Sequence, residues 1–128
     1  MPIWWFRDFV NERGENVIHT WLNSAEVSHA KAKINARIAT LQGFPFFPEQ
    51  YFSSYQGWDG LYELRIGFGG VQFRPFGFYG PGRRQFTLLV GGIEKGGKVP
   101  RSLLTTAHQR RVIASLNPTR FTCEHDFS

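Results

Sequence analysis

The sequence contains little cysteine, no long apolar run and few acidic residues in its second half. Its only cysteine, Cys123, cannot form an intramolecular disulfide, which excludes the class of small disulfide-rich domains. No apolar segment approaches the roughly 20 residues that a membrane-spanning helix needs. The first residues, Met1-Pro2-Ile3, lack the basic flank of a secretion signal. We therefore expect a soluble, cytoplasmic protein that does not bind membranes.

The composition is typical of one globular domain that spans residues 1–128. Apolar residues make up 41% of the chain and charged residues 20%, which excludes a disordered chain. Aromatic residues reach 16%, so rings can fill much of the core and leave some for a binding surface. Fourteen Gly and seven Pro predict many turns and argue against a plain helical bundle.

The two halves of the chain carry net charges of opposite sign. Residues 1–64 hold five basic and seven acidic groups, a net charge of −2, whereas residues 65–128 hold ten basic and three acidic groups, a net charge of +7. Such a basic half predicts a polyanionic partner, either a nucleic acid or an acidic protein segment. A basic surface that only keeps the protein soluble is the simpler alternative.

The first half of the chain predicts a strand followed by two helices. The bulky apolar run at residues 3–6 predicts the strand, and residues 15–23 have the apolar spacing of a short helix. Residues 23–26 resemble a capping box, which predicts that a second helix starts here and ends before Gly43 and Pro45. One apolar face of this helix is formed by Val27, Ala30, Ile34, Ile38 and Leu41.

The second half changes to the period of two that is typical of strands. After a linker without periodicity at residues 43–58, strands are predicted at residues 62–66, 71–74 and 85–90 as a meander, with a bulge or an edge at Pro75. A last helix is predicted at residues 101–116. This order predicts an α+β fold in which two N-terminal helices pack on a mainly antiparallel sheet, with one C-terminal helix.

Several well-known site types are excluded. Residues 92–98 fit a phosphate-binding loop, but Val99 stands where a Ser or Thr hydroxyl must hold magnesium. Residues 123–126 contain atoms that bind metals, but adjacent side chains of an extended segment point apart, so we expect a frayed, solvated tail. Cys123 in this tail is a poor candidate for a nucleophile. We expect neither a metal nor a cofactor.

The candidate site is a set of basic residues in the second half. Its members are Arg65, Arg74, Arg83, Arg84, Lys95, Lys98 and Arg101. Arg65 shares the face of its strand with Glu63, opposite Tyr62 and Leu64, and is therefore predicted to project away from the core. Guanidinium groups on such a sheet surface can bind phosphates through paired hydrogen bonds. Alternatively, Glu63 and Arg65 form only cross-strand salt bridges.

Three motifs in this region resemble the RelE/ParE toxin superfamily, and more narrowly its HigB-like, phage-derived toxins. The family pattern L-x-E-L-R matches residues 61–65, the pattern Y/F-R matches residues 73–74, and the Lys-rich pattern K-x-x-K-x-P matches residues 95–100. The predicted order of elements is also the order of that family. The resemblance therefore implies the RelE-like version of the α+β fold.

The resemblance also implies a function and roles for single residues. The protein is expected to be the toxin of a type II toxin–antitoxin pair, a metal-independent endonuclease that cuts mRNA on the ribosome. A cognate helix-turn-helix antitoxin is the expected protein partner. Arg65, Arg74 and Lys95 then supply positive charge at the cleaved phosphate, and His108 is the candidate for proton transfer. RNA-binding roles fall to Arg83, Arg84, Lys98 and Arg101.

Two positions depart from the family pattern, and two alternative functions follow. Glu94 replaces one of two consecutive lysines, and Pro75 interrupts the strand directly after Arg74. Both departures favour a RelE-like phage protein that binds or regulates without cleaving. A ParE-type gyrase poison is a further alternative, because the superfamily includes both activities.

Overall fold

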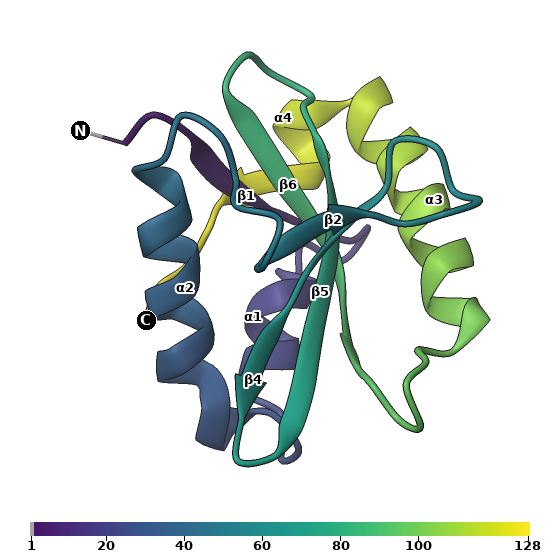
Figure 1. Cartoon of the computed structure of the whole chain (residues 1–128). Helices are drawn as coiled ribbons and strands as arrows, with labels where there is room; N and C mark the ends of the chain where they lie inside the picture. The colour runs from purple at the N-terminus through teal and green to yellow at the C-terminus, as the bar shows by residue number, and fades with distance from the viewer. Residues whose placement is uncertain (1) are drawn as a thin grey trace.

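One sheet forms the centre of the molecule, and helices cover both of its faces (Figure 1). The structure, a computed structural model, describes residues 2–128. Along the chain the elements are β1 (Trp5–Phe9), α1 (Val17–Leu22), the 3-10 turn η1 (Ser28–Ala30), α2 (Lys31–Gln42), β2 (Phe52–Ser54), β3 (Tyr62–Leu64), β4 (Ile66–Phe68), β5 (Val71–Tyr79), β6 (Gln85–Ile93), α3 (Arg101–Leu116), α4 (Pro118–Phe121) and β7 (Thr122–Glu124).

The sheet has seven strands and is mainly antiparallel. Its order is β2-β3-β5-β6-β1-β7, with β4 paired to β5 beside β3. The pair β1–β6 is parallel, with Phe6 opposite Phe86, and the other strand pairs are antiparallel. The predicted α+β fold with a mainly antiparallel sheet and a C-terminal helix is therefore confirmed.

The two faces of the sheet carry separate cores because neighbouring strand residues point to opposite sides. On one side, α1 and α2 bury a cluster that includes Phe73 and Phe86, and on the other side α3 buries a cluster that includes Phe76 and Leu89. Among residues 2–128 no helix is both long and apolar enough to cross a membrane.

The helical pair differs from the prediction at one boundary. Asn16 caps α1, because its side chain accepts hydrogen bonds from the backbone N–H groups of Ile18 and His19. The predicted capping box at residues 23–26 does not start the second helix. The Ser24 hydroxyl instead donates to the Trp21 carbonyl at the end of α1, and α2 begins only at Lys31, after η1. Its apolar face and its end at Gly43 agree with the prediction.

The predicted strand at residues 62–66 is divided at Arg65 into β3 and β4. Glu63 lies opposite Phe76, and Ile66 lies opposite Phe73, so the interruption at Leu64 and Arg65 faces Pro75 and Arg74 of β5. Proline has no N–H to donate to a neighbouring strand, which accounts for the break in pairing. Pro75 itself pairs with Gly91 of β6, and the bulge predicted there is found one residue later, as a register shift between Phe76 and Gly77.

The C-terminal segment is ordered, and the prediction of a frayed tail was wrong. β7 pairs with β1, and His125 follows it into the interior with a side chain that is 1% exposed. Its Nδ1 lies 2.7 Å from the Asp8 carboxylate, and its Nε2 lies 2.8 Å from the side-chain oxygen of Asn35. Local sequence patterns missed this because both partners are distant in the sequence and buried polar groups are stable only when such partners exist.

Candidate functional site

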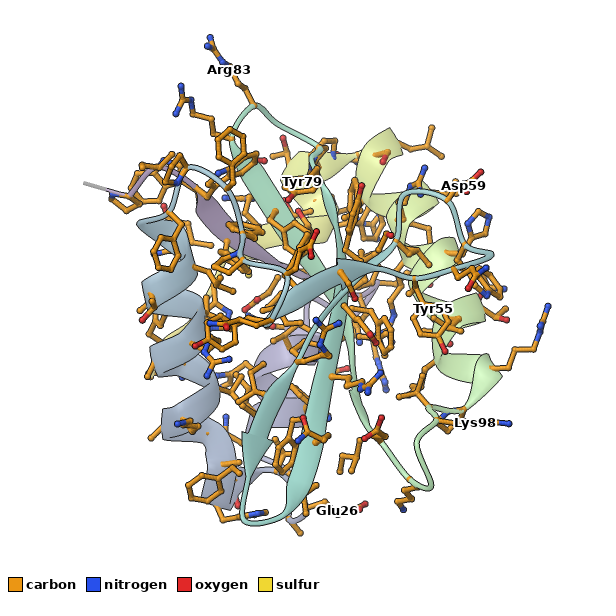
Figure 2. The ribbon with its side chains drawn as sticks, in the orientation of Figure 1. Glu26, Tyr55, Asp59, Tyr79, Arg83 and Lys98 are labelled. Atoms are coloured by element: carbon orange, nitrogen blue, oxygen red, sulfur yellow. The ribbon has the colours of Figure 1, made fainter. Side chains whose placement is uncertain are left out.

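The predicted basic residues form two groups at opposite ends of the β5–β6 hairpin. Arg83 and Arg84 lie in its turn, whereas Lys95 and Lys98 follow the other end of β6 (Figure 2). The nine residues of β6 separate Arg84 from Glu94, which corresponds to about 30 Å at ~3.4 Å per residue. The two groups therefore cannot contact the same phosphate.

Arg74 is the centre of a charged cluster at the second end of the hairpin. Its Nη1 lies 3.0 and 3.1 Å from the two carboxylate oxygens of Glu63, and its Nη2 donates to the carboxylate of Glu94. The side chains of Glu63 and Arg74 are only 8% and 17% exposed. Two carboxylates thus surround one guanidinium in a poorly hydrated position, where charges interact strongly.

Arg65 joins this cluster from the break between β3 and β4. Its Nη1 lies 3.6 Å from Glu63, and its guanidinium also donates to the Ser53 hydroxyl and to the Glu49 carbonyl. Arg65 therefore links the sheet to β2 through Ser53. It also contacts the Glu63 carboxylate, which binds Arg74.

The expected open sheet face with projecting arginines was wrong, and α3 is the reason. Residues Leu104 and Ala107 of α3 pack on the face that carries Glu63, so this carboxylate is buried. A buried carboxylate needs a cation, and Arg74 supplies it. The alternative from the sequence, ion pairing across the strands through Glu63, is the arrangement that the structure shows.

Lys95 and Lys98 flank a tight turn that leaves both ammonium groups exposed. The backbone N–H of Lys95 donates to the Lys98 carbonyl at 2.8 Å, and the two residues between them, Gly96 and Gly97, have φ values of 60° and 78°. Only glycine adopts this left-handed backbone readily. The turn therefore presents two free cations next to Glu94 and directly before α3.

A tryptophan that the sequence analysis did not single out lies beside α3. Trp58 belongs to the β2–β3 loop, which reaches over α3 in Figure 1. The Arg101 guanidinium carbon lies 5.5 Å from its ring, and the His108 ring lies 6.2 Å from it. Arg101 and His108 are seven residues apart and hence on one side of the helix.

The backbone of this loop is fixed to the rest of the molecule. The Trp58 N–H donates to the Tyr55 carbonyl, and Arg111 of α3 donates to the Asp59 carbonyl at 2.6 Å. In the sequence, this turn is marked only by Trp58 between two glycines, Gly57 and Gly60. In the structure both glycines have positive φ values. An aromatic ring in a fixed turn beside basic residues is a common feature of surfaces that stack nucleic-acid bases.

The structure thus gathers three exposed cations, one imidazole and one indole around the start of α3. Lys95, Lys98 and Arg101 can bind phosphates, and the exposed His108 can accept or donate a proton. Cys123 is not a comparable reactive group. Burial raises the pKa of its thiol, and the nearby Asp8 carboxylate raises it further, so the thiol is protonated at neutral pH and a weak nucleophile.

One comparison with known proteins gives a match. The profile of the family described as "Phage derived protein Gp49-like (DUF891)" matches residues 20–112, a range that runs from the end of α1 to most of α3. Neither a curated protein sequence nor a solved structure matches the chain. The profile covers far more than half of the sequence and includes the charged cluster, the lysine turn and Trp58. The chain therefore belongs to the Gp49-like family of phage-derived proteins, a family of the RelE/ParE-like toxin type.

Proposed function

We propose that this protein is the HigB-like toxin of a type II toxin–antitoxin pair and that it cleaves mRNA on the ribosome. Membership of a RelE/ParE-like, phage-derived family supports the toxin role. The observation that supports action on RNA is the group of exposed cations, imidazole and indole around the start of α3. RNA supplies its own nucleophile, the 2′-hydroxyl, so this chemistry requires no metal ion.

In the proposed reaction, His108 removes the proton of a 2′-hydroxyl. The freed oxygen attacks the adjacent phosphorus, the bond to the 5′-oxygen breaks, and that oxygen takes up a proton from solvent. The products are a 2′,3′-cyclic phosphate and a 5′-hydroxyl end. Lys95 lies nearest in sequence to the Arg74 cluster, and its ammonium stabilises the negative charge that develops on the phosphorane.

The neighbouring residues hold the RNA. The exposed Lys98 and Arg101 bind flanking phosphates, and the Trp58 ring offers a face on which an unpaired base stacks. Arg65 and Arg74 act differently from the free cations, because protein groups already occupy their guanidinium nitrogens. Their ion pairs fix the strands that carry the site.

A translation assay tests this proposal. In a cell-free system, the wild-type protein is expected to stop synthesis and to produce mRNA fragments with 5′-hydroxyl ends. The double variant Lys95→Ala/Lys98→Ala is expected to cut at least about tenfold more slowly, since a hydrogen bond to a charged group contributes about 1.5–3 kcal/mol. The control is Lys33→Ala/Arg120→Ala, which removes two exposed cations elsewhere. Intact mRNA with the wild type, or equal rates for the two double variants, would contradict the proposal.

A second candidate function is RNA binding without cleavage, and the position of Arg74 favours it. Two carboxylates already neutralise this arginine, and the Glu94 carboxylate stands next to Lys95, where it repels phosphate. A protein that only occupies the ribosome, or that competes for the antitoxin, needs no catalytic arginine.

The variant Glu94→Gln distinguishes the two candidates. The Glu94 side chain is partly exposed, so removal of its charge lowers the repulsion of a nearby phosphate by about 1 kcal/mol. RNA binding is therefore expected to tighten about fivefold. The proposed nuclease then cuts faster, whereas a binding protein binds more tightly and still produces no fragments. Binding is measured by fluorescence anisotropy with a labelled single-stranded RNA, and Glu12→Gln serves as the control. Unchanged affinity would show that Glu94 does not face the RNA.

A further inference from the structure

Exposed aromatic side chains gather at the end of the sheet opposite the lysine turn. Three chain segments meet here, namely the start of β1, the chain after α2 and the β5–β6 turn. Phe46 is 85% exposed and Tyr79 40%. We define the aromatic–arginine patch as Trp4, Phe46, Tyr79, Arg83 and Arg84.

Direct contacts join the three segments. The Trp4 ring lies 5.1 Å from the Tyr79 ring, and its indole N–H donates to the Pro45 carbonyl next to Phe46. The backbone N–H of Trp5 donates to the Arg84 carbonyl at 2.8 Å. These contacts bring the start of β1, the chain after α2 and the β5–β6 turn together at one end of the sheet.

Two rings of this patch, Trp4 and Tyr79, pack on the rings beneath them. Tyr79 packs at 5.2 Å from the buried Phe86, and Phe47 lies 5.5 Å from Trp4 and 4.9 Å from Phe52. A ring that is already fixed loses little conformational entropy when a partner covers it. Large rigid aromatics beside arginines are the residues that contribute most to protein–protein binding.

The charge of the patch is positive and unbalanced. Arg83 and Arg84 are exposed, and within residues 2–128 neither forms an ion pair with a carboxylate. Burial, together with the smaller effect of the neighbouring Tyr62, raises the pKa of Tyr79 to about 12, so its phenol stays neutral. A complementary partner therefore carries acidic groups beside an apolar anchor.

We propose that the aromatic–arginine patch binds a segment of the antitoxin that carries acidic and apolar side chains, and this inference rests on the proposed function. Arg65 and Arg74 are poor alternatives for the antitoxin's acidic groups because internal carboxylates and carbonyls already bind them. Arg83 and Arg84 are free. The patch also lies about 30 Å along β6 from the lysine turn, so the antitoxin anchors away from the RNA site.

Two other occupants fit the patch less well. A second copy of this chain would pair the patch with itself in a symmetric dimer, and the arginines of both copies would then repel one another. Single-stranded RNA needs cations along its whole backbone, whereas here both cations lie in one turn and rings form the rest of the patch.

The test titrates the full chain with the purified product of the neighbouring gene, which is the candidate antitoxin. The patch variant Phe46→Ser/Arg83→Glu/Arg84→Asn is expected to bind about a hundredfold more weakly than the wild type. Asparagine is chosen at position 84 because Arg84 has a φ of 58°, which asparagine tolerates. The matched control is Leu116→Ser/Lys33→Glu/Arg120→Gln. It removes a similarly exposed aliphatic side chain and changes the net charge by the same amount, but at other positions, and it is expected to bind as the wild type does.

A second measurement separates this inference from the proposed function. Without antitoxin, the single variant Phe46→Ser, which removes no residue expected to bind RNA, is expected to stop translation as the wild type does. Its rescue is expected to require more antitoxin than rescue of the wild type. The affinity for the antitoxin can be measured whether or not the wild type cuts mRNA. The inference about the patch is therefore tested even if the proposed nuclease activity is absent. Equal antitoxin affinity of the patch variant and the wild type overturns the inference.

The alternative occupants are tested directly. A wild-type dimer in sedimentation that the patch variant no longer forms would identify a second copy as the occupant. A loss of poly(U) binding in the patch variant, with antitoxin affinity unchanged, would identify RNA. Either result overturns the assignment to the antitoxin.

Discussion

Replacement of His125 by Ala is expected to lower the free energy of unfolding by about 3 kcal/mol. The imidazole joins β1 and α2, because its two nitrogens contact Asp8 and Asn35 at 2.7 and 2.8 Å. Asp8 is completely buried, and without the ring its carboxylate keeps only the side chain of Asn16 and the backbone N–H of Asp126. A buried charge that loses a partner is strongly destabilising.

Urea unfolding followed by tryptophan fluorescence measures this effect. The control is Glu124→Ala, the exposed neighbour in β7, which is expected to change stability by less than about 0.5 kcal/mol. Similar unfolding midpoints for His125→Ala and the wild type would show that the contacts with Asp8 and Asn35 contribute little.

Replacement of His108 by Ala is expected to slow mRNA cleavage by about a hundredfold to ten-thousandfold, the usual contribution of a positioned proton-transfer group. The side chain is exposed on α3 and contacts the Trp58 ring from outside the core, so its removal is expected to leave stability and RNA affinity unchanged. The loss then appears in the cleavage rate alone.

Added imidazole gives a second readout for this variant. A small base that enters the space left by the side chain is expected to restore part of the cleavage by His108→Ala, which a purely structural role would not permit. His29→Ala, which removes another exposed imidazole, serves as the control. Cleavage by His108→Ala at the wild-type rate would exclude His108 as the base.

Arg74 is a less informative position for such tests. Truncation of Arg74 leaves the 6% exposed Glu63 without its principal cation, and the fold loses stability for that reason alone. A loss of translation arrest in Arg74→Ala therefore has two possible causes. The exposed Lys95, Lys98 and His108 separate chemistry from folding because no buried group depends on them.

The sequence predicted the elements whose patterns are local. The apolar spacing of α1 and α2 indicates their buried faces, and the alternation around Leu64 indicates which face of the strand is buried. It also predicted that Glu63 and Arg65 share one face. It did not show that α3 covers that face, because the docking of a helix on a sheet depends on residues far apart in the chain. The burial of Glu63 and its pairing with Arg74 follow from that docking.

The same reason explains why Trp58 and His125 were missed as important residues. Trp58 gains its role from Arg101 and His108, which lie 43 and 50 positions later, and periodicity carries no information about such distances. A histidine near the end of a polar segment has the pattern of a solvated residue. Its burial depends on Asp8, which lies 117 positions earlier and is itself an unusual residue within an apolar strand.

The link between His125 and β1 affects how the chain folds during synthesis. β1 leaves the ribosome among the first segments, yet its outer neighbour β7 and the imidazole that contacts Asp8 are synthesised more than a hundred residues later. Until then one edge of β1 has no paired strand, and the Asp8 carboxylate favours hydration over burial. Contacts of such long sequence separation slow folding. The nascent chain therefore acquires its complete sheet only after His125 has emerged, and a partly synthesised copy exposes β1 to chaperones and proteases.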